Sequence, residues 1–233
     1  MGIESILTPR LRAIAGSVPQ GAIVADVGTD HAYIPVYLCQ TGKIKAALAM
    51  DVHLGPLERA ERNIERFSLD KRIQTRLSDG LAALLPGEAD TAVIAGMGGL
   101  LIAQILEAAP FFLDTYILQP MTAVAELRVY LATHGYKITR EVLAQEDNKL
   151  YTVMTVCRGQ MQIASPVYEL VGEELIKERD PLTPQLIDGL LLKHEQMLSG
   201  LNNCERAELL EKKSAVLAMI LSLKKLKEEC SQW

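Results

Sequence analysis

The chain has few cysteines and no long apolar run, and these two absences limit the kind of protein it can be. Four cysteines are spread over 233 residues. None forms a C-x-x-C pair, so neither a disulfide framework nor a zinc site is indicated. No apolar run approaches the roughly 20 residues of a membrane-spanning helix, and residues 1–16 lack a signal-peptide layout. We therefore expect a cytoplasmic protein that needs neither a metal nor a membrane.

A positive net charge is also missing. The formal charge is −5, so a nucleic-acid partner would require locally concentrated basic residues. Such a concentration occurs on a helix predicted over residues 55–67, where Arg59, Arg62 and Arg66 share one face. Acidic residues alternate with them, so this face either contacts phosphate groups or is simply solvated, with the second interpretation slightly ahead.

The start of the chain allows the same two interpretations, phosphate contact or simple solvation. A helix is predicted over residues 4–15, with a possible break at Pro9. Arg10 and Arg12 on this helix are candidates for contacts to substrate phosphates. Two solvated arginines are the more common outcome for such a pair.

The stretch AIVADVGTDHAYIP, residues 22–35, organises the first part of the chain. Its apolar beginning predicts a buried parallel strand that stops near Asp26. Gly28 allows a tight turn with close approach of a ligand, and a helix is predicted from Tyr33. A strand, an acidic residue, a glycine turn and a helix together predict the first unit of a nucleotide-binding α/β fold.

Two further predicted strands also end in an acidic residue. Asp51 ends the strand predicted over residues 43–52, where it could accept hydrogen bonds from ribose hydroxyls or cap the next helix. Asp79 and Gly80 follow the strand predicted over residues 72–77. This Asp-Gly pair either contacts the exocyclic amine of an adenine or forms a plain turn.

Glycines crowd the end of the fourth predicted strand, residues 91–95. Gly96, Met97 and Gly98 precede a helix predicted over residues 100–109, and this spacing indicates a close approach of the backbone to a ligand or to a neighbouring helix. The fifth predicted strand, residues 116–118, runs into Gln119 and Pro120.

Five strand–helix repeats predict a parallel sheet with helical crossovers. Two β-rich runs, residues 136–142 and 150–158, predict a closing hairpin that makes the last strand antiparallel. We therefore expect an α/β, Rossmann-like domain over residues 1–160.

Residues 161–233 differ in composition and predict a helical appendage. Leucines at helical spacing predict one helix over residues 183–201 and a second over 205–229, joined by a turn at residues 199–204. Leu209, Val216, Ile220 and Leu223 form a heptad-like seam on the second helix. The hairpin could be a coiled-coil arm, a self-association surface or an RNA contact. Lys224, Lys225 and Lys227 could meet phosphate, although acidic residues outnumber basic ones after position 158.

Two classes of nucleotide-binding domain share this layout. A nicotinamide-binding dehydrogenase needs G-x-G-x-x-G in the first turn, and that spacing is absent after Gly28. A class I S-adenosylmethionine methyltransferase places acidic residues after its first three strands and ends in an antiparallel hairpin. Asp26, Asp51, Asp79 and the predicted hairpin match all four features, so this class is preferred.

The motifs D-V-G-T-D-H-A-Y-I-P, A-G-M-G-G and Q-P-M, followed by a helical appendage, resemble the bacterial tRNA (adenine-22-N1)-methyltransferase family over essentially the whole chain. The resemblance implies methyl transfer from S-adenosylmethionine to N1 of adenine 22 in tRNA. Asp26, Gly28, Asp51, Asp79, Gly80 and Gly96 would bind the cofactor. The alternatives are a methyltransferase for another RNA or a small molecule, and a non-catalytic protein that binds the cofactor or RNA.

Two departures from the general methyltransferase class bear on mechanism. Asp30 and Ala32 replace the second and third glycines of the first turn, and the exit A-G-M-G differs from the Asn/Asp-Pro-Pro-Tyr motif used for exocyclic amines. A ring nitrogen carries its own lone pair, so alignment is the main task, and a carboxylate would stabilise the cationic product. Asp30 is the first catalytic candidate and His31 the second. Arg10, Arg12, Met97, Gly98, Gln119 and Pro120 are candidates for substrate contacts.

Overall fold

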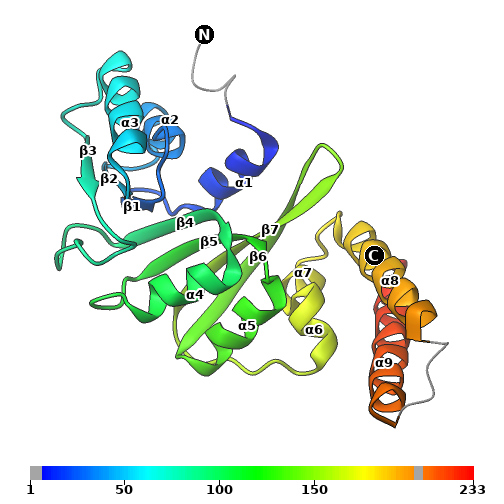
Figure 1. The fold of residues 1–233 in the computed structure, drawn as a ribbon. Helices are drawn as coiled ribbons and strands as arrows, with labels where there is room; N and C mark the ends of the chain where they lie inside the picture. Colours follow the sequence, from blue (N-terminus) through cyan, green and yellow to red (C-terminus); the bar gives the residue numbers. More distant parts are fainter. Residues whose placement is uncertain (1–6, 202–206) are drawn as a thin grey trace. The chain divides into compact units, whose positions relative to one another are not determined.

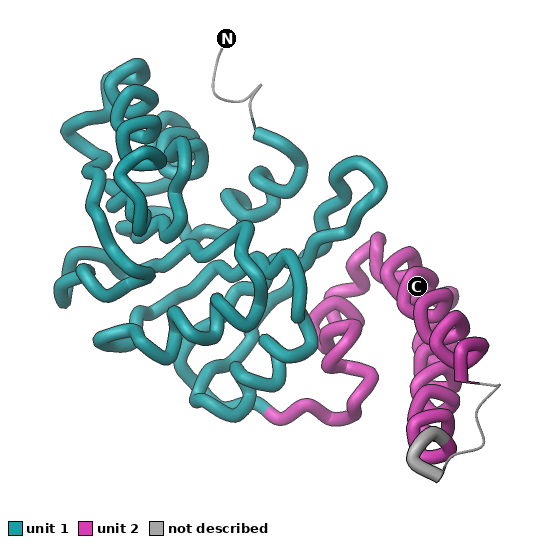
Figure 2. The backbone as a smooth tube through the Cα atoms, viewed as in Figure 1, with its two compact units in different colours: residues 1–161 teal, residues 162–233 magenta. Residues whose placement is uncertain are grey.

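The computed structural model describes residues 7–201 and 207–233, with the side chains of 207–209 left out. The chain divides into two compact units, residues 1–161 and 162–233 (Figure 2). Parts of the predictions made from the sequence lie outside the described residues: residues 202–204 of the predicted turn at 199–204, residues 4–6 of the helix predicted over 4–15, and the side chain of Leu209.

The first unit contains a seven-stranded sheet in the order β3-β2-β1-β4-β5-β7-β6 (Figure 1). β1 to β5 pair in parallel, and β7 pairs antiparallel with both β5 and β6. The predicted α/β sheet with a terminal antiparallel strand is therefore confirmed. The strands are β1 Ile23–Val27, β2 Ala46–Asp51, β3 Ile73–Leu77, β4 Thr91–Gly98, β5 Thr115–Thr122, β6 Tyr136–Glu146 and β7 Lys149–Arg158.

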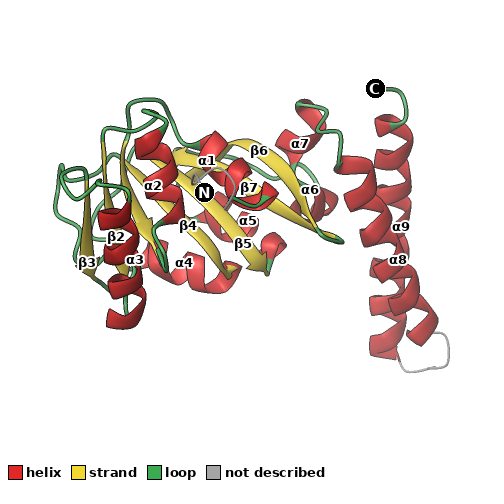
Figure 3. Cartoon of the chain, turned by 90° about the horizontal axis from the view of Figure 1, so that it is seen from above, coloured by secondary structure: helices red, strands yellow, loops and turns green. Residues whose placement is uncertain are grey.

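Helices cover both faces of this sheet, giving three layers (Figure 3). Alternation along β1 sets the two faces, because Val24 packs with the helices of one side while Ala25 and Val27 pack with those of the other. The first side carries α1 Pro9–Ser17, α2 Tyr33–Gln40 and α3 Leu54–Arg66; the second carries α4 Gly99–Glu107 and α5 Val124–Thr133.

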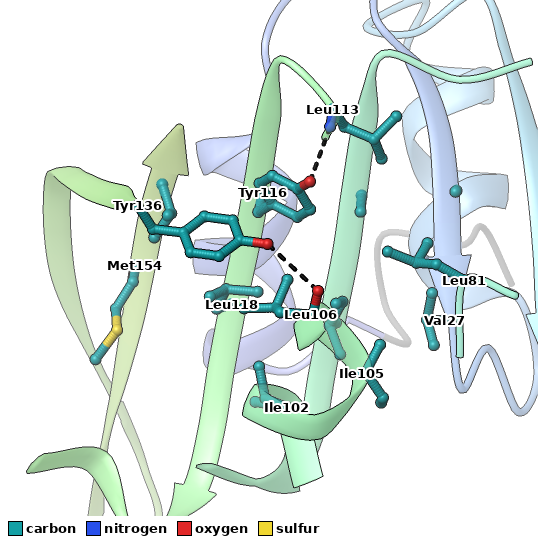
Figure 4. Packing of buried hydrophobic residues seen from close by; sticks show 14 of the residues in the cluster. Val27, Leu81, Ile102, Ile105, Leu106, Leu113, Tyr116, Leu118, Tyr136 and Met154 are labelled. Carbon is teal, nitrogen blue, oxygen red and sulfur yellow. Dashed lines mark hydrogen bonds between the residues drawn. The ribbon is translucent and has the colours of Figure 1, made fainter. Parts of the chain in front are cut away.

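The core of the second side includes two buried tyrosines whose hydroxyl groups both have partners (Figure 4). The Tyr136 hydroxyl donates to the Leu106 carbonyl at 3.5 Å, and the Tyr116 hydroxyl accepts the Leu113 amide at 2.8 Å. Burial raises the pKa of both tyrosines, so they remain neutral parts of the core.

β4 and β5 are longer than predicted, because their mutual pairing continues past the glycines and the proline. Ala95 pairs with Gln119 and Met97 with Pro120, across a bulge. Pro120 can sit in β5 because the antiparallel pairing with β7 ends at Leu118, so no partner there needs its missing N–H. The helix predicted over residues 4–15 with a possible break at Pro9 begins at Pro9 among the described residues, since residues 7 and 8 are not helical. Pro9 stands at the first position of α1, where proline is tolerated, and Thr8 caps the helix.

The second unit is helical, with α6 Pro166–Val171, α7 Glu173–Lys177, α8 Thr183–Leu201 and α9 Ala207–Cys230. Apolar residues of α6, α8 and α9 form one core, which includes Val216, Ile220 and Leu223 of the predicted seam. Lys227 pairs with Asp188 and Lys224 with Glu195, so α8 and α9 run antiparallel and two of the three clustered lysines have acidic partners. In the described part of the chain, no helix is both long and apolar enough to cross a membrane.

A buried ion pair joins α5 to β6. Arg128 donates from Nε and Nη2 to Oε1 of Glu141 at 2.9 and 2.8 Å, and both side chains are at most 2% exposed. Leaving one buried charge without its partner typically costs about 3–5 kcal/mol, whereas an apolar replacement of both can be neutral.

We therefore predict that Glu141→Gln lowers the free energy of unfolding by about 3 kcal/mol. The double variant Arg128→Met/Glu141→Leu should regain most of that loss. Denaturant unfolding measures both. A single variant as stable as the wild type would contradict this assignment.

Candidate active site

A hollow of about 360 Å³ opens at the carboxyl end of β1, where the strand order reverses between β1 and β4. Such a reversal point is the usual ligand site of an open α/β sheet. The walls come from α1, from the loop and helix after β1, and from the end of β4; they are Arg10, Leu11, Asp26, Val27, Gly28, Thr29, Asp30, His31, Tyr33, Ile34, Ala95 and Gly96.

The loop between β1 and α2 places three residues in the left-handed backbone region. Gly28 has φ of +74°, Asp30 of +45° and Ala32 of +53°. At Gly28 a Cβ would lie 2.3 Å from Cε of Met97, so this position has no room for a side chain while Met97 stays in place. Asp30 and Ala32 thus keep a conformation that suits the glycines of the general motif, although a non-glycine residue there is strained.

Asp26, the last but one residue of β1, has a buried carboxyl group that faces this hollow; the residue is 5% exposed. Burial raises its pKa to about 6, the nearby charge of Asp51 acts in the same direction, and a 2.6 Å hydrogen bond from the Thr29 hydroxyl opposes the shift. A buried carboxylate with one polar partner is suited to bind an ammonium group.

Asp51 serves the turn before α3 and still has capacity for a ligand. Its Oδ1 accepts the amide of His53 at 2.9 Å, which stabilises the turn, but the N-cap residue of α3 is His53 and Asp51 does not cap the helix. Its Oδ2 has no hydrogen-bond partner among the described residues. The side chain is 11% exposed, which leaves this oxygen able to accept a hydroxyl.

A second hollow, of about 400 Å³, lies beyond Asp51 and is lined by Val52, Leu77, Ser78, Asp79, Ala82 and Ala83. Val52 and Leu77 are 54% and 53% exposed, which is unusual for aliphatic residues directly at strand ends. Two apolar walls beside the Asp79 carboxylate suit a flat heterocycle that carries an amine. Val52 and Leu77 were not predicted as site residues, although their position next to strand ends was the available signal.

The glycines after β4 separate into two groups. Gly96, with φ of +78°, lines the first hollow. Gly98 and Gly99 lie against the end of β5 instead, since a Cβ would come within 3.2 Å of Thr122 Oγ1 and 2.3 Å of the Ala123 carbonyl oxygen. Gly80 has a similar packing reason, because a Cβ there would meet Ile105 of α4 at 2.9 Å.

Gln119 lies behind the first hollow and holds two of its walls together. It is fully buried, and its Oε1 accepts from Nη1 of Arg10 at 2.8 Å and from the Gly96 amide at 3.2 Å. Its Nε2 donates to the Pro120 carbonyl at 2.9 Å. Among the predicted substrate contacts, Arg10 therefore lines the hollow, whereas Gln119 and Pro120 stand behind it.

The guanidinium of Arg10 is also fixed from the opposite side. Its Nε lies 3.8 Å from Oε2 of Glu146, and its Cζ lies 5.5 Å from the centre of the Tyr151 ring. Arg12, two positions further along α1, is exposed and is not among the lining residues.

Asp30, His31 and Tyr33 form the outer wall of the first hollow. The His31 and Tyr33 rings are parallel within 8° at 5.0 Å between centres, and Nε2 of His31 lies 3.6 Å from Oδ2 of Asp30. Arg59 of α3 donates to Oδ1 of Asp30 from Nη2 at 2.6 Å and from Nε at 3.2 Å. Arg59 remains 41% exposed, as the solvated interpretation expects, but it also has a partner 29 positions earlier in the chain.

Acidic groups thus follow three adjacent strands, and two hollows of different polarity adjoin them. Within the described residues, no group of three or more His, Cys, Asp and Glu side chains could hold a metal ion. The arrangement can bind a ligand with an ammonium group, hydroxyls and a flat ring, and it can present an aromatic pair and a carboxylate to a second molecule.

The raised pKa of Asp26 predicts a measurable dependence of stability on pH. The folded state binds the Asp26 proton more tightly than the unfolded chain does, so this group lowers the free energy of unfolding as pH rises from about 4 to about 6, with no further change above. We predict that Asp26→Asn raises the free energy of unfolding of the ligand-free protein at pH 7.5 by up to about 3 kcal/mol.

That gain should be small near pH 4, because Asp26 is protonated in the folded state there and only about half ionised in the unfolded chain. Denaturant unfolding at the two pH values measures it. Asp114→Asn, at an exposed aspartate outside both hollows, is the matched control. A variant that is less stable than the wild type at both pH values would contradict the assignment.

Comparison with known proteins agrees with this geometry. Residues 7–154 match the family model described as a methyltransferase domain. The chain is 38% identical over 185 residues to the tRNA (adenine(22)-N(1))-methyltransferase of Bacillus subtilis, covering 76% of this chain and 78% of that protein.

Solved structures show the same similarity. A Streptococcus pneumoniae protein in complex with S-adenosyl-L-methionine is 36% identical, with a TM-score of 0.82, over 95% of this chain and 99% of that chain. M. capricolum TrmK in complex with S-adenosyl-homocysteine is 27% identical, with a TM-score of 0.81, over 96% and 99% of the two chains. Fold, site and relatives together show that the chain belongs to the tRNA (adenine(22)-N(1))-methyltransferase family.

Proposed function

We propose that this protein transfers a methyl group from S-adenosylmethionine to N1 of adenine 22 in tRNA. Residues 1–160 would carry the reaction and residues 161–233 would serve as a helical appendage. The observation that carries this proposal is that Asp30 and His31 line the same hollow as the buried carboxyl group of Asp26, next to the ends of β2 and β3.

The residues present fit S-adenosylmethionine as the cofactor. Asp26 offers a buried carboxylate for the amino group of the methionine part, and Gly28 and Gly96 leave backbone accessible beside it. Asp51 keeps one carboxylate oxygen for the ribose. The second hollow offers apolar walls and Asp79 to an adenine ring. Gly80 supports this hollow through its packing on α4.

When bound, S-adenosylmethionine supplies the methyl group as an electrophile. Adenine N1 carries its own lone pair, so the protein need not remove a proton before the attack and instead must align the base. The parallel rings of His31 and Tyr33 offer a flat surface at the mouth of the first hollow. A carboxylate near the ring opposes the positive charge that develops on the base, and Oδ2 of Asp30 is the oxygen that Arg59 leaves available.

The substrate base must leave its pair to reach this site, because N1 lies on the Watson–Crick edge. Gly96 leaves room at one wall, and Arg10 lines the same wall, with its Nη1 3.9 Å from where a Cβ on Gly96 would be. Met97 and Gly98 would contact the substrate from the end of β4, and Arg12 would contact it from the exposed face of α1. Gln119 and Pro120 would act from behind, by keeping Arg10 and Gly96 in place.

We also propose that the C-terminal helices support self-association. Leu210, Leu217 and Leu221 are exposed on α9, at spacings of seven and four residues. Self-association of the protein that does not depend on added cofactor or tRNA would distinguish this role from an RNA contact.

The function is tested with labelled S-adenosylmethionine and unmodified bacterial tRNA, with the product nucleoside identified by mass spectrometry. The proposal expects N1-methyladenosine, and it expects the signal to vanish when adenine 22 is replaced. Transfer to a different position or RNA would favour the alternative substrate. Cofactor binding without transfer to any RNA would favour a binding role.

Asp51→Ala is predicted to weaken the affinity for S-adenosylmethionine at least tenfold, because the ribose loses its acceptor. Isothermal titration calorimetry measures the dissociation constant. Asp114→Ala, a matched loss of an exposed aspartate, should leave it unchanged. An unchanged constant for Asp51→Ala would refute the ribose assignment.

Asp30→Ala is predicted to keep cofactor affinity within about twofold while lowering kcat about 10²-fold, as expected for loss of a group that stabilises the transition state. Single-turnover methylation gives the rate and calorimetry gives the affinity. If Asp30→Ala abolished cofactor binding instead, Asp30 would belong to the cofactor site.

A further inference from the structure

We infer that Arg59 is a positioning residue for the methyl transfer, which it serves by fixing the Asp30 carboxylate and, together with Asn63, the loop between β1 and α2. This inference rests on the proposed function, since it concerns the same hollow. It gives α3 a part in the reaction, whereas the sequence pattern alone slightly favoured a solvated face for this helix.

Two side chains on one face of α3 reach the loop. Arg59 donates twice to Oδ1 of Asp30, from Nη2 at 2.6 Å and from Nε at 3.2 Å. Asn63, four positions later, donates from Nδ2 to the carbonyl of His31 at 2.8 Å. Positions four apart lie on the same helix face. One helix face therefore holds two successive residues of the loop, one through its side chain and one through its backbone.

The loop has a reason to need such support. Asp30 and Ala32 are non-glycine residues with positive φ, and conformations of this kind cost on the order of 1 kcal/mol each and persist only when their surroundings fix them. Ala32 is also the residue before α2, where no side chain caps the helix. The loop makes some backbone bonds of its own, from Gly28 and Thr29 to Met50 and from Ala32 to Thr29. Beyond these and the hydrogen bond from Thr29 to Asp26, Arg59 and Asn63 of α3 supply side-chain contacts to the loop.

The Arg59–Asp30 pair contributes little to stability but can have a large effect on the reaction rate. Arg59 and Asp30 are 41% and 59% exposed, so solvent screens their attraction and the pair contributes about 0–1 kcal/mol to stability. A displacement of about 1 Å in a reacting group can lower a rate about 10²-fold. Loss of Arg59 should therefore leave the fold intact and reduce the rate.

Arg59 acts through Asp30, because Arg59 lines neither hollow. Its two bonds to Oδ1 fix the position of that oxygen and leave Oδ2 on the side of His31, whose Nε2 lies 3.6 Å away. His31 in turn stacks on Tyr33. The order of contacts, Arg59 to Asp30 to His31 to Tyr33, connects α3 to the mouth of the hollow.

The competing explanation is that Arg59 contacts a tRNA phosphate. Arg62 offers the matched control, since it lies on the same helix, carries the same charge and has no hydrogen bond or ion pair to a described residue. A phosphate contact at Arg59 would raise KM for tRNA and reduce its dependence on salt. A positioning role would lower kcat instead.

The kinetic test is a double-mutant cycle on the full chain. Arg59→Ala should lower kcat about 10-fold or more, with the dissociation constant for S-adenosylmethionine within twofold of the wild type. In the Asp30→Ala background the same substitution should have no further effect, because its target is gone. Arg62→Ala should keep kcat, and Arg59→Lys should recover only part of the rate, because a lysine cannot make the two-nitrogen contact.

Hydrogen exchange of the ligand-free protein provides a readout that does not depend on tRNA. Arg59→Ala and Asn63→Ala should speed the exchange of the amides in residues 28–36, and Arg62→Ala should not. Equal exchange in all four proteins, or equal loss of kcat on removing Arg59 with and without Asp30, would overturn the inference. A wild type that fails to methylate adenine 22 would refute the proposed function while leaving the exchange result interpretable.

Discussion

The left-handed conformation of the loop after β1 is the constraint on which the site depends. Gly28, Asp30 and Ala32 all have positive φ, and the amides of Gly28 and Thr29 both donate to the Met50 carbonyl of the neighbouring strand β2. Because of this path, Asp26 below the loop and Asp30 and His31 within it line one hollow. A loop in ordinary extended conformation would carry those side chains away from the strand end.

The same loop shows how the protein gives up stability at its site. Asp26 is a carboxyl group buried beside the charge of Asp51, with its pKa raised to about 6. At neutral pH the folded state holds this group ionised, which is unfavourable in the absence of a cation. A bound ammonium group would offset that cost, so the feature that weakens the ligand-free protein is the one that favours the ligand.

The sequence predicted the parts of the site that depend on local pattern. Strand ends are visible as apolar runs that stop at an acidic residue, and this identified Asp26 and Asp51 as the side chains at the edge of the sheet. Distant contacts left no such pattern. Nothing near Gly99 indicates that the Ala123 carbonyl lies where its side chain would be. Nothing around Arg59 indicates a partner 29 positions away.

The lengths of β4 and β5 also could not be predicted from local sequence pattern. Glycines and a proline predicted that β4 and β5 end early, yet pairing between the two strands extends both of them. Gln119 then lies inside a strand, fully buried, where it connects Arg10 to Gly96. Local propensity could not show this network, because each of its three members lies on a different element.

The most direct test of this site is a crystal structure of the protein with S-adenosyl-homocysteine. We predict that the amino group of the ligand contacts the Asp26 carboxylate, that its adenine lies between Val52 and Leu77 beside Asp79, and that its sulfur points toward Asp30 and His31. An adenine bound in the first hollow, or a sulfur directed away from those two residues, would contradict the proposed methyl-transfer site.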